Sequence, residues 1–236
     1  CADCADTCFT CSGSSENDCD VCTTRKGTDV KLFVNRVNFT PPVNNENLKK
    51  VGSKIVESAE LLVPDEPLDY LVYCCTSCAT NLGDQCIIDI LGDSRPGIPN
   101  TNPATAGKIA LQALGINRIG LVTPYIQEVC ESVGGYFEDA SITVTVGTYM
   151  NCETDYDISR VSRQTLIDAA IKASEDADAV FLSCAALPAI DVIQEVEQIT
   201  GKPVVTSNSS MIWLVLNNFG ITVPDHIGML KDYKPE

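Results

Sequence analysis

The fold of this chain is decided by two stretches of sequence, LDYLVYCC at residues 68–75 and ADAVFLSC at residues 177–184. Each is a short apolar run of strand length, and each ends in a cysteine. Runs of this kind are typical of strands buried on both faces of a parallel sheet. Both stretches are therefore predicted to be buried strands, with Cys75 and Cys184 at their carboxyl ends.

The two strands open the two halves of an internal repeat. Each strand-end cysteine is followed by small residues, and each half continues with a polar pair, a helix and a triplet centred on glycine. The landmarks recur 105 to 109 residues apart in the same order. They are Cys75 and Cys184, then Thr101-Asn102 and Ser207-Asn208, then Leu114-Gly115-Ile116 and Phe219-Gly220-Ile221. The repeat predicts two similar lobes related by a pseudo-twofold axis, with both thiols facing one cleft.

From residue 30 onward, strand-like runs alternate with amphipathic helices, which predicts a mostly parallel sheet covered by helices. The expected strands are Val30–Val37, Leu68–Cys75, Arg118–Thr123, Ile142–Val146, Asp178–Cys184 and Pro203–Ser207. The expected helices begin near Asn45 and Pro124 or cover Pro103–Leu114, Ser162–Asp176, Leu187–Thr200 and Ser209–Phe219.

We therefore expect an α/β fold of two pseudo-symmetric, doubly wound lobes with parallel sheets. The N-terminal lobe is expected to take residues 1–108, completed by the C-terminal helix within 209–236, and the second lobe residues 109–208. Because ligand sites in open α/β sheets lie beyond the carboxyl ends of the strands, we expect the active site in the cleft between the lobes.

Composition narrows the class of function. The chain has 236 residues, with 16 Lys and Arg against 32 Asp and Glu, so its formal net charge is −16. Such an acidic surface repels phosphate backbones, which argues against nucleic-acid binding. No apolar run is long enough to cross a membrane, and we see no secretory signal. Thirteen cysteines in a chain of alternating strands and helices favour a reducing, cytoplasmic location.

Two opposed thiols can perform acid–base or nucleophilic chemistry without a cofactor. A thiolate beside the backbone N–H groups of a strand-to-helix turn has a depressed pKa and acts as a base or nucleophile. The opposed thiol then acts as the acid. Proton removal on one face of a carbon and delivery on the other inverts a stereocentre, whereas addition to an alkene allows bond rotation before elimination. We predict Cys75 and Cys184 as this pair.

Either reaction passes through an enediolate-like carboxylate, which hydrogen-bond donors must stabilise. The two turns offer backbone N–H groups at Thr76, Ser77, Ala185 and Ala186, and Tyr125 offers a phenol. We predict these five residues to bind a small carboxylate or dicarboxylate substrate.

Four stretches resemble the aspartate/glutamate racemase superfamily, and within it the maleate isomerases. They are YCCTSC (Tyr73–Cys78), INRIGLVTPY (Ile116–Tyr125), VFLSCAALPAIDVIQEVE (Val180–Glu197) and GKPVVTSN (Gly201–Asn208). Arylmalonate decarboxylases and the racemase-like proteins of ectoine breakdown are also similar.

The resemblance implies a nucleophilic thiol at Cys75, a proton-handling thiol at Cys184 and no cofactor. It also implies carboxylate contacts from Tyr125 and the two turns. Arylmalonate decarboxylases carry glycine where this chain has Cys75, which favours an isomerase or racemase. The first choice is maleate-to-fumarate isomerisation through a Cys75 adduct. The alternative is racemisation of an amino acid or its derivative, of the aspartate, hydantoin or ectoine-breakdown type, and decarboxylation is less favoured.

The chain departs from the family at two places. Maleate isomerases carry a substrate-binding asparagine before the helix that opens near Ser162, whereas the alignment places Asp155 there. A negative charge at this position disfavours maleate itself. The family also begins with an apolar strand and a loop that supplies another substrate-binding asparagine, for which Asn17 is the candidate.

The N-terminal region is rich in cysteine instead. Its Cys-x-x-Cys pairs have a spacing that suits zinc or an iron–sulfur cluster. They are formed by Cys1, Cys4, Cys8, Cys11, Cys19 and Cys22. A metal- or ligand-binding protein that kept the fold is therefore the non-enzymatic alternative, although the favoured interpretation assigns no metal. By analogy with the family, a homodimer is possible.

Overall fold

The computed structural model describes residues 22–23 and 30–235. Asn17 and five of the six N-terminal cysteines lie outside the described residues, so their predicted roles are not addressed by the structure. Of that cysteine group only Cys22 is described, as part of a short strand.

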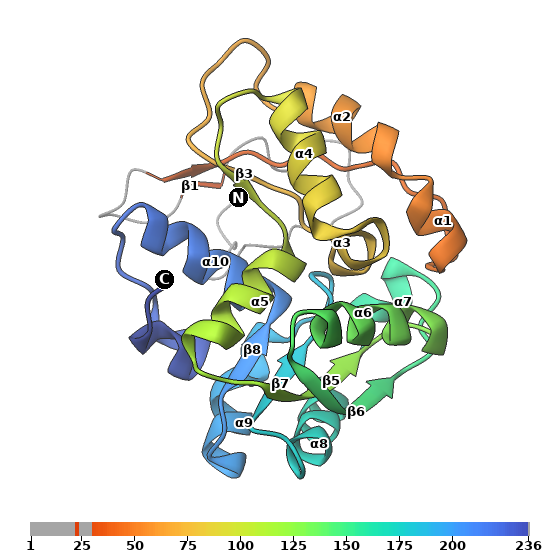
Figure 1. The fold of residues 1–236 in the computed structure, drawn as a ribbon, viewed down its shortest axis with the longest axis vertical. Coiled ribbons are helices and arrows are strands. Elements are labelled where there is room, and N and C mark those ends of the chain that lie inside the picture. The colour runs from red at the N-terminus through yellow and green to blue at the C-terminus, as the bar shows by residue number, and fades with distance from the viewer. Residues whose placement is uncertain (1–21, 24–29, 236) are drawn as a thin grey trace.

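The first half of the chain builds a helical layer over a short sheet (Figure 1). Its elements are β1 (Cys22–Thr23), β2 (Lys31–Leu32), α1 (Asn45–Lys49), α2 (Gly52–Glu60), β3 (Leu71–Val72), α3 (Thr76–Leu82), α4 (Asp84–Ser94), β4 (Asn100–Thr101) and α5 (Pro103–Ala113). Strands β3 and β4 pair in parallel, with Leu71 opposite Asn100. Helices α2 and α4 pack against each other beside this pair.

The second half carries the larger sheet. Its elements are β5 (Arg118–Thr123), α6 (Gln127–Asp139), β6 (Thr143–Tyr149), α7 (Asp155–Ser159), α8 (Arg163–Ser174), β7 (Ala179–Leu182), η1 (Ile190–Val192), α9 (Ile193–Thr200), β8 (Val204–Thr206), α10 (Ser207–Asn218) and η2 (Asp225–Asp232). Its four strands run in parallel in the order β6-β5-β7-β8. The parallel sheets of an α/β fold are confirmed.

Helices cover both faces of the larger sheet. Successive residues of a strand point to opposite faces, so a strand with apolar residues throughout needs a helix on each side. Gly120 of β5 faces α8, where an added Cβ would lie 2.0 Å from the carbonyl oxygen of Ala173. Only glycine therefore permits this close approach. On the other face, Phe181 of β7 lies against Gly107 of α5, and Leu121 lies against Gly134 of α6. The core of this half is the sheet itself, sandwiched between the two helical layers.

The internal repeat is visible in the way α5 and α10 end. Gly115 and Gly220 both have a positive φ, of 69° and 64°, which suits glycine after a helix. In both, the following isoleucine N–H donates to a carbonyl five residues back: Ile116 to Leu111 and Ile221 to Leu216, each at 2.9 Å. The two helices pack against each other (Figure 1). The equivalent ends support the predicted duplication.

Three sequence expectations are corrected. Within the described residues, the strand expected over Val30–Val37 is formed at Lys31–Leu32 alone, in an antiparallel ladder with β1, because the side chains of this run have no buried face and Val34 is 70% exposed. The cap of α1 is Asn44 rather than Asn45, since the Asn44 side chain accepts from the N–H of Asn47. The helix expected over Leu187–Thr200 begins only at Ile193, after the 3-10 turn η1.

No helix within 22–23 and 30–235 has the length and apolar character to span a membrane.

Candidate active site

Cys75 stands at the start of α3, where its extended backbone (φ −139°, ψ 107°) makes it the N-cap residue. The first N–H groups of a helix have no acceptor within the helix, so they are free to point at the capping side chain. Its Sγ lies 3.6 Å from the hydroxyl of Ser77. A hydrogen bond from the Cys78 thiol, helped by the Ser77 hydroxyl and the Cys78 N–H, outweighs burial and lowers the pKa of Cys75 to about 7.

Cys78 is fully buried on the same turn of α3, and its Sγ also lies 3.7 Å from the carbonyl of Leu48. Its single hydrogen can serve one acceptor at a time, and a charged thiolate is the stronger one. The hydrogen bond to Cys75, followed by burial, raises the pKa of Cys78 well above that of a free thiol. Cys78 therefore stays neutral, and its proton can turn from the Leu48 carbonyl to the Cys75 thiolate.

Cys184 lies just beyond β7 and is 8% exposed. Its φ of 112° is a conformation that side chains other than glycine rarely adopt, and strained backbone of this kind clusters at functional sites. Burial raises the pKa of its thiol to about 12, an effect that the nearby Tyr125 hydroxyl and the Ala186 N–H partly oppose. At neutral pH Cys184 therefore carries its proton.

A polar bridge ties the two cysteine turns together. The N–H of Cys184 donates to the hydroxyl of Ser207 at 3.0 Å, and this hydroxyl lies 2.7 Å from that of Thr76. Next to it, the Asn208 side chain donates to the carbonyl of Ala185 at 3.1 Å. The Thr76 hydroxyl and the Ala185 carbonyl thus hold the two turns in position. The backbone N–H groups of these two residues remain as the candidates for binding a substrate.

Tyr125 supplies a buried phenol next to the thiols. The residue is 1% exposed, and its hydroxyl has no hydrogen-bond partner of good geometry among the described residues. Burial, followed by the charges of Cys184 and Cys75, raises its pKa well above the ordinary value. A buried hydroxyl without a partner is costly unless a ligand supplies one, so this group is free to donate to a bound carboxylate.

Asp155, the first residue of α7, lies close enough for its charge to raise the pKa of both Cys75 and Cys184, as a smaller effect than the hydrogen bonds and burial above. Its Oδ2 accepts from the Nη2 of Arg36 at 3.0 Å. Arg36 was not among the sequence candidates. The signal available for it was an arginine inside the strand-like run Val30–Val37, in a chain poor in cations.

The structure therefore brings together Cys75, Cys184, Tyr125, Ser77 and Asp155, on turns from both halves of the molecule. Within the described residues, no group of three or more His, Cys, Asp or Glu side chains is placed to hold a metal ion.

A hollow of about 630 Å³ lies elsewhere, between α1, α3, α5 and α6. Its Lys108 is already paired with Asp84 at 3.0 Å, and the Tyr136 hydroxyl donates to the same carboxylate at 2.7 Å. Because Lys108 and Asp84 neutralise each other there, we place the candidate site at the thiols.

Comparisons with known proteins identify the family of the chain. The arylmalonate decarboxylase of Bordetella bronchiseptica is 35% identical over 120 residues, which cover 50% of this chain and 50% of that protein. The maleate isomerase of Alcaligenes faecalis is 26% identical over 143 residues, or 59% of this chain and 56% of that protein. The chain thus spans about half the length of these curated relatives.

One solved structure shares the fold across most of the chain. It is the maleate cis-trans isomerase of Nocardia farcinica, in a cysteine-to-serine variant with a covalently bound succinylcysteine intermediate. It superposes with a TM-score of 0.75 at 18% identity and covers 81% of this chain and 82% of that one.

Fold and site together define a two-lobed α/β protein with parallel sheets and a pair of thiols on opposed turns. Residues 83–228, more than half of the chain, match the family model of arylmalonate decarboxylase. The chain belongs to the arylmalonate decarboxylase family, and the resemblance to this family and to the maleate isomerases is confirmed.

Proposed function

We propose that this protein is a cofactor-independent cysteine isomerase of a small carboxylic acid, with maleate-to-fumarate isomerisation as its reaction. The observation that carries the proposal is that the pKa values of two neighbouring thiols are shifted in opposite directions. The pKa of Cys75 falls to about 7, whereas that of Cys184 rises to about 12. Titratable groups whose environments push their pKa values apart are the usual mark of an assigned base or nucleophile and an assigned acid.

In the proposed mechanism, the Cys75 thiolate adds to one alkene carbon of maleate, forming the C–S bond. The alkene electron pair moves onto the neighbouring carboxylate, which becomes enediolate-like. Cys184 gives its proton to the adjacent carbon, and the former double bond, now single, rotates. Cys184 then takes the proton back, the double bond re-forms and the C–S bond breaks to release fumarate.

The negative charge that develops on the carboxylate needs donors already in place. The Tyr125 hydroxyl is a buried side-chain donor that has no partner among the described residues. The N–H groups of Thr76 and Ser77 lie in the first turn of α3, where no carbonyl of the helix can accept from them. On the other turn, the N–H groups of Ala185 and Ala186 have the same role.

The relatives support this chemistry without deciding the substrate. A maleate isomerase is among the similar proteins, and the Nocardia farcinica isomerase carries a succinylcysteine, which is the adduct expected from a thiolate and maleate. The similarity to an arylmalonate decarboxylase makes decarboxylation an outcome to test. Racemisation of an amino-acid derivative is the second candidate, because the Asp155 carboxylate beside the thiols suits a substrate with an ammonium or N–H group.

The deciding experiment is a proton NMR time course in D2O under reducing conditions, with maleate as the only substrate. We expect fumarate with the wild type and none with Cys75→Ser. If maleate stays unchanged with protein that is folded and has its thiols reduced, maleate isomerisation is refuted. Aspartate, a hydantoin and phenylmalonate offered in turn would then distinguish racemisation, seen as exchange of the α-proton, from decarboxylation.

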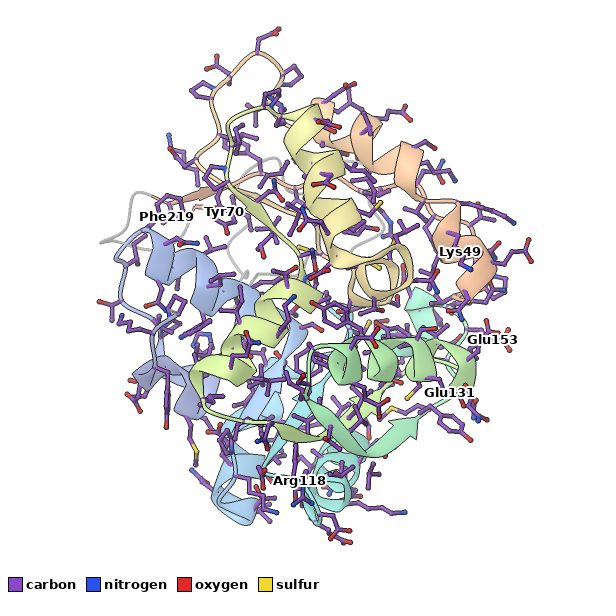
Figure 2. All side chains as sticks on the ribbon, in the orientation of Figure 1. Lys49, Tyr70, Arg118, Glu131, Glu153 and Phe219 are labelled. Atoms are coloured by element: carbon purple, nitrogen blue, oxygen red, sulfur yellow. The ribbon has the colours of Figure 1, made fainter. Side chains whose placement is uncertain are left out.

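We also propose that residues 109–208 form one lobe and that residues 1–108 form the other with the C-terminal helix. The supporting contact lies at the end of α10, where Phe219 meets Tyr70 beside β3 (Figure 2). Their ring centroids are 6.1 Å apart, edge to face, and the Asn218 side chain donates to the Tyr70 hydroxyl at 3.3 Å. A homodimer and a cytoplasmic location stay predictions.

A further inference from the structure

The segment that precedes α1 crosses the loop that precedes α7, and two contacts join them. The N–H of Val43 donates to the carbonyl of Glu153 at 2.8 Å, and the Nη2 of Arg36 donates to the Oδ2 of Asp155 at 3.0 Å. Figure 2 labels Glu153 on this loop, close to α1. Arg36 and Asp155 are 119 residues apart in sequence, so the ion pair links the two halves of the molecule.

The backbone of Arg36 is held in place, while its head group is exposed to solvent outside its contact with Asp155. Its carbonyl accepts from the hydroxyl of Ser58 at 3.5 Å, and the neighbouring Asn35 side chain donates to the carbonyl of Ser58 at 3.0 Å. The Arg36 side chain is nevertheless 81% exposed, and that of Asp155 is 53% exposed. An ion pair this exposed contributes little to stability, so the fold has small need of it.

The charges around the thiols call for a cation. The Cys75 thiolate and the Asp155 carboxylate are both negative, and each would repel the second carboxylate of a dicarboxylate substrate. The phenol and backbone N–H groups of the site are neutral donors that cannot cancel both charges. Arg36 is the cation paired with Asp155, whose charge reaches both thiols.

We propose that Arg36 is a specificity-determining residue that binds the substrate carboxylate remote from the Cys75 adduct, and that Asp155 positions it. This inference rests on the proposed function and deepens it by assigning the residue that selects a dicarboxylate. A guanidinium has five N–H donors in a planar fork, so it keeps Asp155 on one edge and presents the other edge to the carboxylate. Asp155 thereby positions Arg36, which explains a carboxylate at a place where its own charge would repel a dicarboxylate substrate.

The two partners of the pair have opposite expected effects on maleate turnover. Arg36→Gln removes a charge-assisted hydrogen bond to the substrate, which raises KM about 10- to 100-fold and leaves kcat within about twofold. Asp155→Asn removes a repelling charge and frees both edges of the guanidinium, so KM falls. A merely structural pair would respond to either change in the same direction, because both break the same contact.

The matched control is Arg163→Gln, which breaks another exposed arginine–carboxylate pair, the one with Glu195. It is expected to leave KM unchanged. Acrylate, a monocarboxylate, competes with maleate and should lose none of its affinity in Arg36→Gln.

The outcomes separate this inference from the proposed function. Turnover of maleate by the wild type with an unchanged KM in Arg36→Gln, or equal losses in both variants, overturns the role of Arg36 and leaves the isomerase intact. Without turnover by the wild type, titration calorimetry with maleate as the probe decides. Weaker binding to Arg36→Gln and tighter binding to Asp155→Asn support the role of Arg36, whereas equal or absent binding overturns it.

Discussion

Cys78→Ala tests the reasoning about the reactive thiol most directly. With a pKa of about 7, Cys75 is about half ionised at pH 7, whereas a thiol at the ordinary value of 9.0 would be about 1% ionised. The Cys78 thiol supplies the largest of the influences that lower this pKa, ahead of the Ser77 hydroxyl and the Cys78 N–H. Without the Cys78 thiol, the effect of burial, which raises the pKa of Cys75, is opposed less strongly. We therefore expect this pKa to rise by at least about one unit and the thiolate fraction at pH 7 to fall several-fold.

The assay is the rate of alkylation by iodoacetamide as a function of pH, followed by mass spectrometry of the Cys75 peptide. Cys74 is adjacent and exposed, so the measurement uses a Cys74→Ser background throughout. The midpoint of the rate profile reports the pKa of the Cys75 thiol, because the thiolate is the reacting species. The expected midpoint is about 7 with Cys78 present and at least about 8 with alanine there.

Cys78→Ser is the matched control, since its hydroxyl keeps a donor of similar size at the same place and should hold the midpoint closer to that of the parent. Circular dichroism checks that each variant is folded. A midpoint near 9 with Cys78 present, or an unchanged midpoint in folded Cys78→Ala, would refute the assignment of Cys78 as the donor to Cys75.

Three further predictions follow from the site and the sheet. Cys184→Ala should reduce turnover at least about 1,000-fold while Cys75 still alkylates with its midpoint near 7; retained turnover would contradict the proton-delivery role. Tyr125→Phe should lower kcat about 10- to 100-fold without lowering the melting temperature, because the hydroxyl it removes has no partner in the unliganded protein; a drop of several degrees would show a structural bond instead. Gly120→Ala should destabilise the fold by about 1–3 kcal/mol in a denaturant titration, since the added methyl meets the Ala173 carbonyl; an unchanged midpoint would mean that α8 can move away.

Much of the fold could be predicted because its determinants are local. Apolar runs such as those ending at Cys75 and Cys184 predict strands, which the structure forms at Leu71–Val72 and Ala179–Leu182. Gly115 and Gly220 end helices through a backbone conformation that few other residues adopt. The strand expected over Val30–Val37 was wrong for the converse reason. Its residues have strand propensity, but propensity yields to the tertiary setting, and no partner strand or buried face meets them beyond Leu32.

The candidate site was predictable only where chemistry follows directly from residue type and position in the repeat. The thiols and the Tyr125 phenol belong to this group. The Arg36–Asp155 pair does not, because a contact between residues 119 positions apart depends on how the two halves are arranged in space. The donor role of Cys78 was also hidden, because its spacing from Cys75 indicates metal binding or oxidation as readily as a hydrogen bond. The choice depends on how the turn of α3 places the Cys78 thiol between the Leu48 carbonyl and Cys75.

The Ser207 hydroxyl, which touches both the Thr76 hydroxyl and the Cys184 N–H, acts as a spacer between the two halves of the reaction centre. Because it is buried and bonded on both sides, the gap between the nucleophile turn and the acid turn is a property of the resting protein rather than of the ligand. The reaction at the substrate carbon between the two thiols is then set by the protein. A change of substrate has to come from the exposed edge of the site, where Arg36 and Asp155 meet. New specificities in this scaffold should therefore be sought by varying this edge while the spacer stays serine.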